Sequence, residues 1–240
     1  MQRLREPADL VAASGGDPLV RHLVPHLSAG APIVASEGAV LFAYDYWDGT
    51  GAQVVGEPVA AAQLALSAAW ELPTDYYAVP EGAVGLLGDA FSPDTPWCFR
   101  WTDQRPAAPH LPAGWLSESE CQEVEALLTA SFPTASARPG SRHARRWAGI
   151  RGTDGRLIAA AADCTGSDVG FMASVVSDTR LRRTGVGVAM TSWMTHALLD
   201  DYGIAALWQY SDNIAATALY DKLGYRDEHR YVGGILRTPS

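Results

Sequence analysis

The sequence predicts an α/β (α+β) protein in which a mixed central β-sheet is flanked by helices, with a second, smaller α/β domain at the N-terminus. Three observations support this class. Hydrophobic residues make up 48% of the 240 residues, which is enough for a sizeable core. Strand-like and helix-like periodicities alternate along the second half. The halves also differ in charge, because residues 1–110 carry a net −8 and residues 111–240 a net −1.

A proline-rich stretch marks the boundary between the two predicted domains. Pro106, Pro109 and Pro112, with Gly114 after them, can support neither a helix nor a strand ladder. We therefore expect an N-terminal mixed α/β domain over 1–105, a linker over 106–114 and a C-terminal domain over 115–240.

Composition excludes several classes of protein. The net charge of −9 argues against a nucleic-acid partner held through phosphates. No uncharged stretch reaches the roughly 20 residues that a membrane helix needs. The charged start of the chain lacks the apolar run of a secretory signal, so a cytoplasmic location is expected. Three cysteines without a Cys-x-x-Cys pair predict neither a disulfide framework nor a metal site.

The first half predicts ordinary secondary structure and no identifiable chemistry. Prolines at the helix starts and apolar spacing support the helices, and alternating aromatic residues support the last strand. The expected helices are 19–27, 58–70 and 80–91, and the expected strands are 40–44, 53–55 and 97–101.

The second half has clearer signals. Ser117 and Glu120 form a capping-box pattern before a helix that ends ahead of Pro133. Thr153-Asp154-Gly155 is a hairpin turn between two strands. A glycine turn and an amphipathic helix follow the third strand, and a later short helix ends at Gly224. The expected strands are 146–151, 156–163, 169–176, 204–210 and 225–238, and the long helix is 186–199.

The turn before the long helix has the features of an anion site. The segment 182–187 presents successive backbone N–H groups at the positive end of a helix dipole, with Arg182 and Arg183 beside them. A P-loop would need Lys-Ser/Thr after Gly187, and a dinucleotide fingerprint would need Gly or Ala where Met190 stands. The pyrophosphate of coenzyme A is the remaining candidate ligand for this site.

Two sequence blocks resemble the signature motifs of the GNAT superfamily of acyl-CoA-dependent N-acyltransferases. The first block, VVSDTRLRRTGVGVAMTSWMTHALL, contains the Q/R-x-x-G-x-G/A loop at Arg182, Gly185 and Gly187. The second, LWQYSDNIAATALYDKLGY, contains Asn213, Leu219-Tyr220 and Leu223-Gly224-Tyr225. The resemblance covers about residues 115–238 and implies a GNAT domain there. The N-terminal half would then be a degenerate GNAT-like domain without the loop.

The resemblance also implies roles for particular residues. Strand residues Val175 to Ser177 would offer backbone groups to the pantetheine arm, and Tyr220 would protonate the departing thiolate. Asn213 would face the pantetheine or the reaction centre, although a helix cap is the simpler explanation of that residue. Packing alone would also explain Tyr220. The full cofactor-binding set is Val175, Val176, Ser177, Arg182, Arg183, Thr184, Gly185, Val186, Gly187, Val188, Asn213, Ala216 and Tyr220.

The general base is not evident. The mechanism that the family implies is direct attack of a neutral amine on the acetyl-CoA thioester, without a covalent enzyme intermediate. The strand before the loop holds no carboxylate, and Asp163 and Asp178 are the nearest candidates, with a solvated turn position as the alternative for each. A water chain, or a Tyr or Glu from the first half, could serve instead. His196, on the long helix away from the loop, is expected to be a surface or packing residue, and His143 to be solvated.

An arginine-rich stretch adds the one basic patch, which would either steer phosphates or form a solvated face. The expected function is transfer of an acetyl group to a primary amine of a small molecule or peptide. The alternative is a non-catalytic acyl-CoA sensor or interaction module. The patch consists of Arg138, Arg142, Arg145, Arg146, Arg151 and Arg156.

Overall fold

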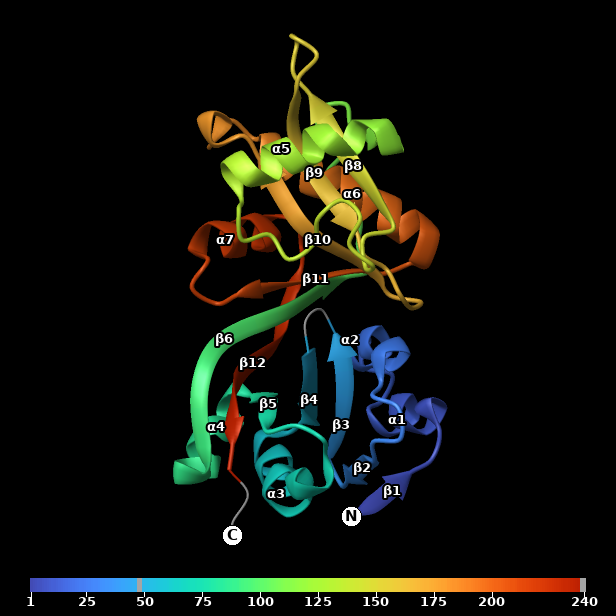
Figure 1. The fold of residues 1–240 in the computed structure, drawn as a ribbon, viewed down its shortest axis with the longest axis vertical. Coiled ribbons are helices and arrows are strands. Elements are labelled where there is room, and N and C mark those ends of the chain that lie inside the picture. Colours follow the sequence, from blue (N-terminus) through green and yellow to red (C-terminus); the bar gives the residue numbers. More distant parts are fainter. Residues whose placement is uncertain (47–48, 238–240) are drawn as a thin grey trace. The chain divides into compact units, whose positions relative to one another are not determined.

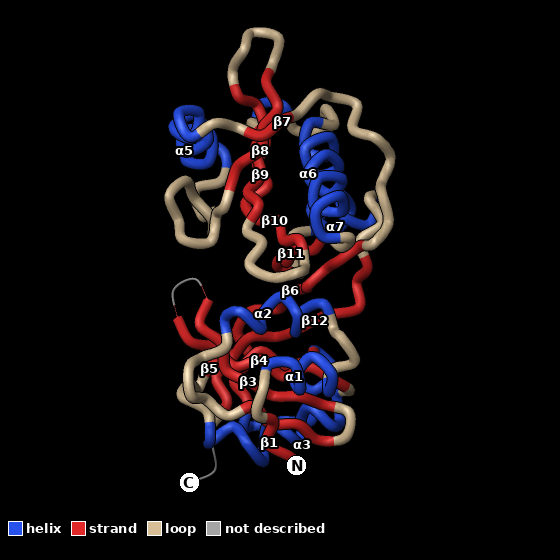
Figure 2. The backbone as a smooth tube through the Cα atoms, turned by 90° about the vertical axis from the view of Figure 1, so that its right-hand side faces the viewer, coloured by secondary structure: helices blue, strands red, loops and turns tan. Residues whose placement is uncertain are grey.

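The computed structural model describes residues 1–46 and 49–237. The chain forms two compact units, which Figures 1 and 2 draw together. The first unit contains Met1–Arg100, Trp208–Ile214 and the described residues from Asp227 onward. The second contains Trp101–Leu207 and Ala215–Arg226. After Leu207 the chain therefore passes between the two units more than once. The sequence-based division into two domains joined by a linker over 106–114 remains a prediction.

The first unit is a mixed sheet whose order is β1-β2-β3-β4-β5-β12-β6. β4 and β5 are parallel, whereas β2–β3, β3–β4 and β5–β12 pair in antiparallel fashion. Its elements are β1 (Gln2–Leu4), α1 (Pro7–Ala13), α2 (Pro18–Leu23), β2 (Ile33–Ser36), β3 (Ala39–Tyr46), β4 (Gly49–Gly56), α3 (Pro58–Ala68), β5 (Tyr76–Pro80), α4 (Val84–Leu87), β6 (Phe91–Thr102) and β12 (Arg226–Leu236).

The second unit repeats this plan with the order β11-β10-β9-β8-β7. β10 and β11 are parallel, and the other neighbours are antiparallel. Figure 2 shows α5 and α6 on opposite faces of this sheet. Its elements are β7 (Gly114–Trp115), α5 (Cys121–Ser131), β8 (Arg146–Arg151), β9 (Leu157–Asp163), β10 (Gly170–Ser177), α6 (Val186–Tyr202), β11 (Ala205–Tyr210) and α7 (Ile214–Lys222).

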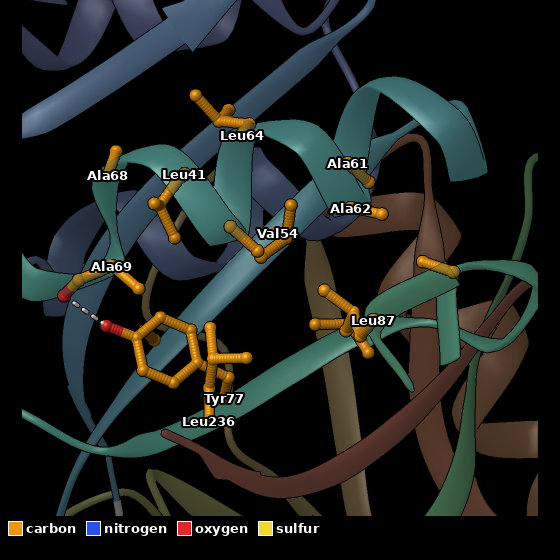
Figure 3. Close-up of a cluster of buried hydrophobic side chains, with 14 of the residues drawn as sticks. Leu41, Val54, Ala61, Ala62, Leu64, Ala68, Ala69, Tyr77, Leu87 and Leu236 are labelled. Atoms are coloured by element: carbon orange, nitrogen blue, oxygen red, sulfur yellow. Dashed lines mark hydrogen bonds between the residues drawn. The ribbon is translucent and has the colours of Figure 1, made fainter. Parts of the chain in front are cut away.

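Small residues bring the covering helix close to the sheet in the first unit. One side of α3 is lined with buried alanines, including Ala61, Ala65 and Ala68, and these residues belong to the same core cluster as Leu41 and Val54 (Figure 3). The Tyr77 hydroxyl closes the lower edge of this core by donating a hydrogen bond to the Ala69 carbonyl at 2.7 Å. A bulkier α3 would stand farther from the strands and leave voids.

The core of the second unit also packs small residues against large ones, but the small residues lie on the sheet and the large ones on the helix. Here the strands provide the small residues, such as Ala159 and Ala161 of β9, and α6 provides the large ones, Met190, Met194 and Leu198. All five side chains are fully buried. Among the described residues, no helix has both the length and the hydropathy to cross a membrane.

The two units share an order of elements, because three antiparallel strands, a helix, a parallel strand and a helix occur in each. In the first unit these are β2-β3-β4-α3-β5-α4, and in the second β8-β9-β10-α6-β11-α7. The predicted fold class is confirmed, since mixed sheets flanked by helices form both units. The repeated order also supports the interpretation of the N-terminal half as a degenerate copy of the C-terminal fold.

Several local expectations need correction. β1, α1, β2, β5 and β7 were not predicted, because each is short. Gly114, assigned to the linker, lies in β7 and pairs with Gly149 of β8. The helix expected over 80–91 is instead a run of short turns around α4, which has only four residues. The helix expected over 19–27 is α2 followed by a 3₁₀ turn. The two strands of the 153–155 hairpin lie where they were expected.

Gly56 at the end of β4 is a position where the fold tolerates no side chain. Its φ is +140°, and a Cβ there would lie 2.1 Å from the Gly38 carbonyl oxygen and 2.7 Å from the Ala39 Cα. Gly56→Ala should therefore lower the free energy of unfolding by about 3 kcal/mol, combining backbone strain with overpacking. Gly30→Ala is the matched control, because Gly30 also has a positive φ but no atom within 4 Å of the added Cβ. It should cost only about 1 kcal/mol. Equal urea midpoints for the two variants would contradict the steric argument.

Candidate active site

A β-bulge distorts β10 just before the glycine turn. Ala173 pairs with Ala162 of β9 and Val176 pairs with Ala160, so β10 contains one extra residue between these pairs. Ser174, in the bulge, has a φ of +50°. Its hydroxyl accepts a hydrogen bond of 2.9 Å from the backbone N–H of Ala137, which holds the bulge in place. Bulges of this kind redirect the strand and free its backbone groups from the ladder.

The other edge of β10 separates from its parallel neighbour. β10 and β11 pair at Gly170–Ala205 and Phe171–Ala206, both at the beginning of β10. Beyond these pairs, β10 continues to Ser177 without a further register partner in β11 among the described residues. The backbone near Val175 and Ser177 is therefore available to a ligand, because unpaired backbone groups need partners. Val175 and Ser177 are half-buried and Val176 is buried.

An ion pair shapes the turn between β10 and α6. The Asp178 carboxylate accepts a hydrogen bond from the Arg180 backbone N–H at 2.9 Å and pairs with the Arg180 guanidinium. The guanidinium, followed by the backbone N–H, lowers the pKa of Asp178 to about 2. Arg183 and Gly185 then adopt φ values of +65° and +89°. These two left-handed residues reverse the chain so that α6 begins at Val186.

The beginning of α6 presents the predicted anion site. Val186, Gly187 and Val188 occupy the first turn, where backbone N–H groups have no partner within the helix. A Cβ at Gly187 would lie 3.7 Å from a Leu219 methyl carbon and 3.9 Å from the Ser177 hydroxyl. Ser177, Gly187 and Leu219 therefore meet at one place, which joins the end of β10 to α6 and α7. The side chains of Arg182, Arg183 and Thr184 are exposed beside it.

The segment between the predicted domains is attached along α6, which sequence reasoning did not foresee. Ser192 donates a hydrogen bond of 2.6 Å to the Ala107 carbonyl, and His196 Nε2 lies 3.0 Å from the Pro106 carbonyl. Arg105 pairs with Asp200. These contacts bring His110 to the start of α6, where its Nε2 would lie 3.0 Å from a Cβ at Gly185. The expected packing role of His196 agrees with these contacts.

Tyr220 has a structural role that explains part of its motif. Gly224 has a φ of +80°, and the Tyr225 N–H donates to the Tyr220 carbonyl at 3.0 Å, which is the Schellman end of a helix. The rings of Tyr220 and Tyr225 lie 5.7 Å apart, as expected for the hydrophobic contact of this motif. The Tyr225 hydroxyl is paired with Thr195 at 2.7 Å. Tyr220 is 8% exposed within the core of the second unit.

Asn213 and Ala216 lie around the start of α7. Asn213 precedes α7, and its backbone N–H donates to the Tyr210 carbonyl at 3.1 Å. It belongs to the segment Trp208–Ile214 of the first unit, so the second unit does not itself bring it to the glycine turn. Ala216 lies in α7 and is half-buried against the core that contains Tyr220.

The two candidate bases are not solvated turn residues, which corrects the sequence-based alternative. Asp163 is fully buried, pairs with Arg146 at 2.9 Å and accepts the Thr165 N–H at 3.0 Å. Asp178 is 7% exposed and is occupied by Arg180. The guanidinium of Arg180 lowers the pKa of Asp178 to about 2, so this carboxylate is a weak proton acceptor, and the Asp163 carboxylate is already bound by Arg146 and Thr165. Neither residue therefore has the properties of a general base.

The arginine-rich stretch is not a free basic patch. Arg138 pairs with Glu125, Arg151 with Glu120 and Glu123, and Arg146 with Asp163 and Asp201. These three of its six arginines are therefore paired with acids, which weakens a role in steering phosphates. His143 is half-buried beside Arg142, rather than solvated as expected. Burial lowers the pKa of His143. Within the described residues, no three His, Cys, Asp or Glu side chains are grouped to hold a metal ion.

A family model described as FR47-like protein matches residues 148–232, which include β10, the glycine turn, α6 and α7. Among curated proteins, none matches the chain.

Solved structures with the same fold align with nearly the whole chain. A GCN5-related N-acetyltransferase from Sphaerobacter thermophilus has a TM-score of 0.62 at 14% identity, covering 99% of this chain and 96% of that one. One from Kribbella flavida has a TM-score of 0.60 at 19% identity, covering 94% and 95%. A putative GNAT-family acetyltransferase from Novosphingobium aromaticivorans has a TM-score of 0.55 at 20% identity, covering 98% and 100%. The chain therefore has the GNAT fold, with an FR47-like domain in its C-terminal part.

The ion pair of Asp178 should make the stability of the chain depend on pH. Because the folded-state pKa is about 2 and the unfolded value about 3.9, the pair stabilises the fold above pH 4 and loses this effect as the pH falls towards 2. Asp178→Asn should thus be less stable than wild type at pH 6, and the difference should shrink by pH 2.5. Urea denaturation at both pH values measures it. Asp212→Asn, at an exposed site, is the control. A constant difference across the pH range would contradict the assignment.

Proposed function

We propose that the chain is an N-acetyltransferase that transfers the acetyl group of acetyl-CoA to a primary amine of a small molecule or peptide. The observation that carries this proposal is the convergence of Ser177, Gly187 and Leu219 at the first turn of α6. The GNAT fold supports acyl-CoA as the cosubstrate. The cytoplasmic location expected from the sequence is part of the same proposal.

The residues present fit a coenzyme A molecule. The backbone N–H groups of Val186, Gly187 and Val188 would bind the pyrophosphate, because they have no partner within the helix and lie at the positive end of the 17-residue α6. Arg182 and Arg183 would add charge-assisted hydrogen bonds. The freed backbone of Val175 to Ser177 would hold the pantetheine arm. Acetyl-CoA supplies an activated acyl thioester when bound.

Backbone N–H groups and one side-chain hydroxyl of this chain would take part in catalysis. Backbone N–H groups near the bulge of β10 would stabilise negative charge on the acyl oxygen. The Tyr220 hydroxyl would donate a proton to the leaving sulfur. An acceptor amine with a pKa near that of lysine is almost fully protonated at pH 7, so its deprotonation must come from a group other than Asp163 or Asp178.

The second candidate function is an acyl-CoA-binding sensor without catalysis. The pairing of Asp178 with Arg180 and the burial of Asp163 favour it, since both nearby carboxylates are occupied. The Schellman contact of Tyr220 also gives that ring a purpose independent of catalysis. Release of thiol from acetyl-CoA in the presence of a panel of primary amines separates the two candidates, because only the enzyme turns over.

Replacing Gly187 should abolish coenzyme A binding. A Trp side chain at this position would fill the space between Ser177 and Leu219 that the pyrophosphate needs. Calorimetry with coenzyme A should show affinity reduced by about 100-fold or more, the equivalent of about 2.7 kcal/mol. Gly114→Trp is the control, because Gly114 has no atom within 4 Å of an added Cβ. Unchanged affinity in Gly187→Trp would refute the location of the cofactor.

Removing the Tyr220 hydroxyl should slow turnover without weakening acetyl-CoA binding. The proton is needed only when the carbon–sulfur bond breaks, so Tyr220→Phe should lower kcat by about 100-fold and leave Kd nearly constant. Phe keeps the ring and its contact with Tyr225. Tyr225→Phe serves as the control, since it loses a buried hydrogen bond to Thr195 and should affect stability rather than kcat. Wild-type kcat in Tyr220→Phe would leave Tyr220 with packing alone.

A further inference from the structure

The first unit contains a cavity of about 460 Å³. Three parts of the unit line it: the turn between α1 and α2, with Gly15 and Asp17; the ends of β4 and β5, with Gly56 and Pro80; and β12, with His229. A volume of this size is within the range of small-molecule sites in proteins.

The position of the cavity in the fold favours a ligand. Gly56 and Pro80 are the last residues of β4 and β5, which run parallel and pair at Ala52–Tyr77 and Gln53–Ala78. In α/β sheets, ligands bind at the carboxyl ends of the strands, where backbone groups leave the ladder. The glycine turn of the second unit follows β10, the strand that corresponds to β4. The cavity thus occupies the place in the first repeat where the second repeat has its candidate cofactor turn.

The first unit is not built to hold a phosphate at this place. α3 begins with Pro58, which has no N–H to donate, and the residue before it is Glu57. A carboxylate at the start of the helix occupies the electrostatic position that a phosphate would need. Coenzyme A is therefore an unsuitable ligand for the cavity, in contrast to the corresponding turn before α6.

The polar groups of the cavity carry both signs of charge. Asp17 Oδ1 accepts the backbone N–H groups of Leu19 and Val20 at 2.9 and 3.2 Å, and Oδ2 lies 2.5 Å from His229 Nε2. With a carboxylate as its partner, Nε2 is the protonated nitrogen and donates the hydrogen bond. These three bonds fix the Asp17 carboxylate in place and leave one of its lone pairs for a further donor. Arg230 is exposed and lines the same cavity.

We propose that this cavity binds a small zwitterion, an α-amino acid or a short peptide. Asp17 binds its ammonium group, Arg230 binds its carboxylate, and apolar residues such as Val40 and Val55 contact its side chain. This site is additional to the proposed acetyl-CoA site and does not depend on it, because every residue involved belongs to the first unit.

Calorimetry on the full chain without coenzyme A tests the proposal. The probes are the twenty protein amino acids and the dipeptides Leu-Gly and Lys-Gly. At least one should bind with a Kd on the order of 1 mM or tighter. For the best binder, the amide lacks the carboxylate and the N-acetyl derivative lacks the ammonium. Each should bind at least about tenfold more weakly, as expected for the loss of one charge-assisted hydrogen bond.

Matched variants locate the binding. Ala13→Trp should abolish it, because Ala13 is exposed at the end of α1 and lines the cavity. Ala12→Trp, on the same helix but outside the lining, should leave it unchanged. Asp17→Asn keeps the helix cap and removes the charge, so affinity for the ammonium form should fall at least about tenfold. Asp89→Asn is its control.

The outcomes are distinguishable. Absence of binding by every probe, or equal binding by Ala13→Trp and Ala12→Trp, would overturn the proposal. Equal affinity for the zwitterion and its amide or N-acetyl derivative would also overturn it. Coenzyme A affinity, measured separately on the same variants, should remain at the wild-type value. A failure of the Gly187→Trp experiment therefore leaves this proposal standing, and the reverse also holds.

Discussion

Two short parallel strand contacts determine where each unit of this chain can bind a ligand. In the first unit β4 and β5 pair at two positions, and in the second β10 and β11 do the same. A parallel pair requires a crossover, which α3 provides in the first unit and α6, after the glycine turn, in the second. The start of the helix and the unpaired strand ends therefore lie together. Both candidate sites lie at this position, at the ends of β4 and β10.

The two units differ in the chemical groups at the start of the crossover helix. Gly185 and Gly187 give the second unit a turn at the N-terminus of α6, where the first N–H groups have no partner within the helix. Glu57 and Pro58 give the first unit a negative charge and one fewer donor. A single anionic ligand would not suit both places. The cavity at Asp17 is instead the proposed place for a positively charged group of a ligand.

Sequence reasoning succeeded where the signals are local. The start of α6 at Val186, the strands around 153–155 and the helix ending before Gly224 depend on glycine conformations or helix caps that neighbouring residues specify. It failed where partners are distant. Asp163 is buried in an ion pair with Arg146. Arg146 also pairs with Asp201, which lies 55 residues away in the sequence. The bulge at Ser174 and the approach of His110 to Gly185 have no periodic signal at all.

The end of helix α7 explains the Leu-Gly-Tyr part of the second motif without any catalytic activity. Gly224 is required there by its left-handed backbone, and Tyr225 contacts Tyr220 because the Schellman ending brings these positions together. A chain that had lost catalysis would still need both residues to end α7 and fill the core. The glycine turn differs, because a Cβ at Gly187 would make only ordinary contacts, 3.7 Å from a Leu219 methyl carbon and 3.9 Å from the Ser177 hydroxyl. Packing does not require a glycine at that position, so Gly187 is the stronger evidence for a bound ligand, and Tyr220 gains functional meaning only from its hydroxyl.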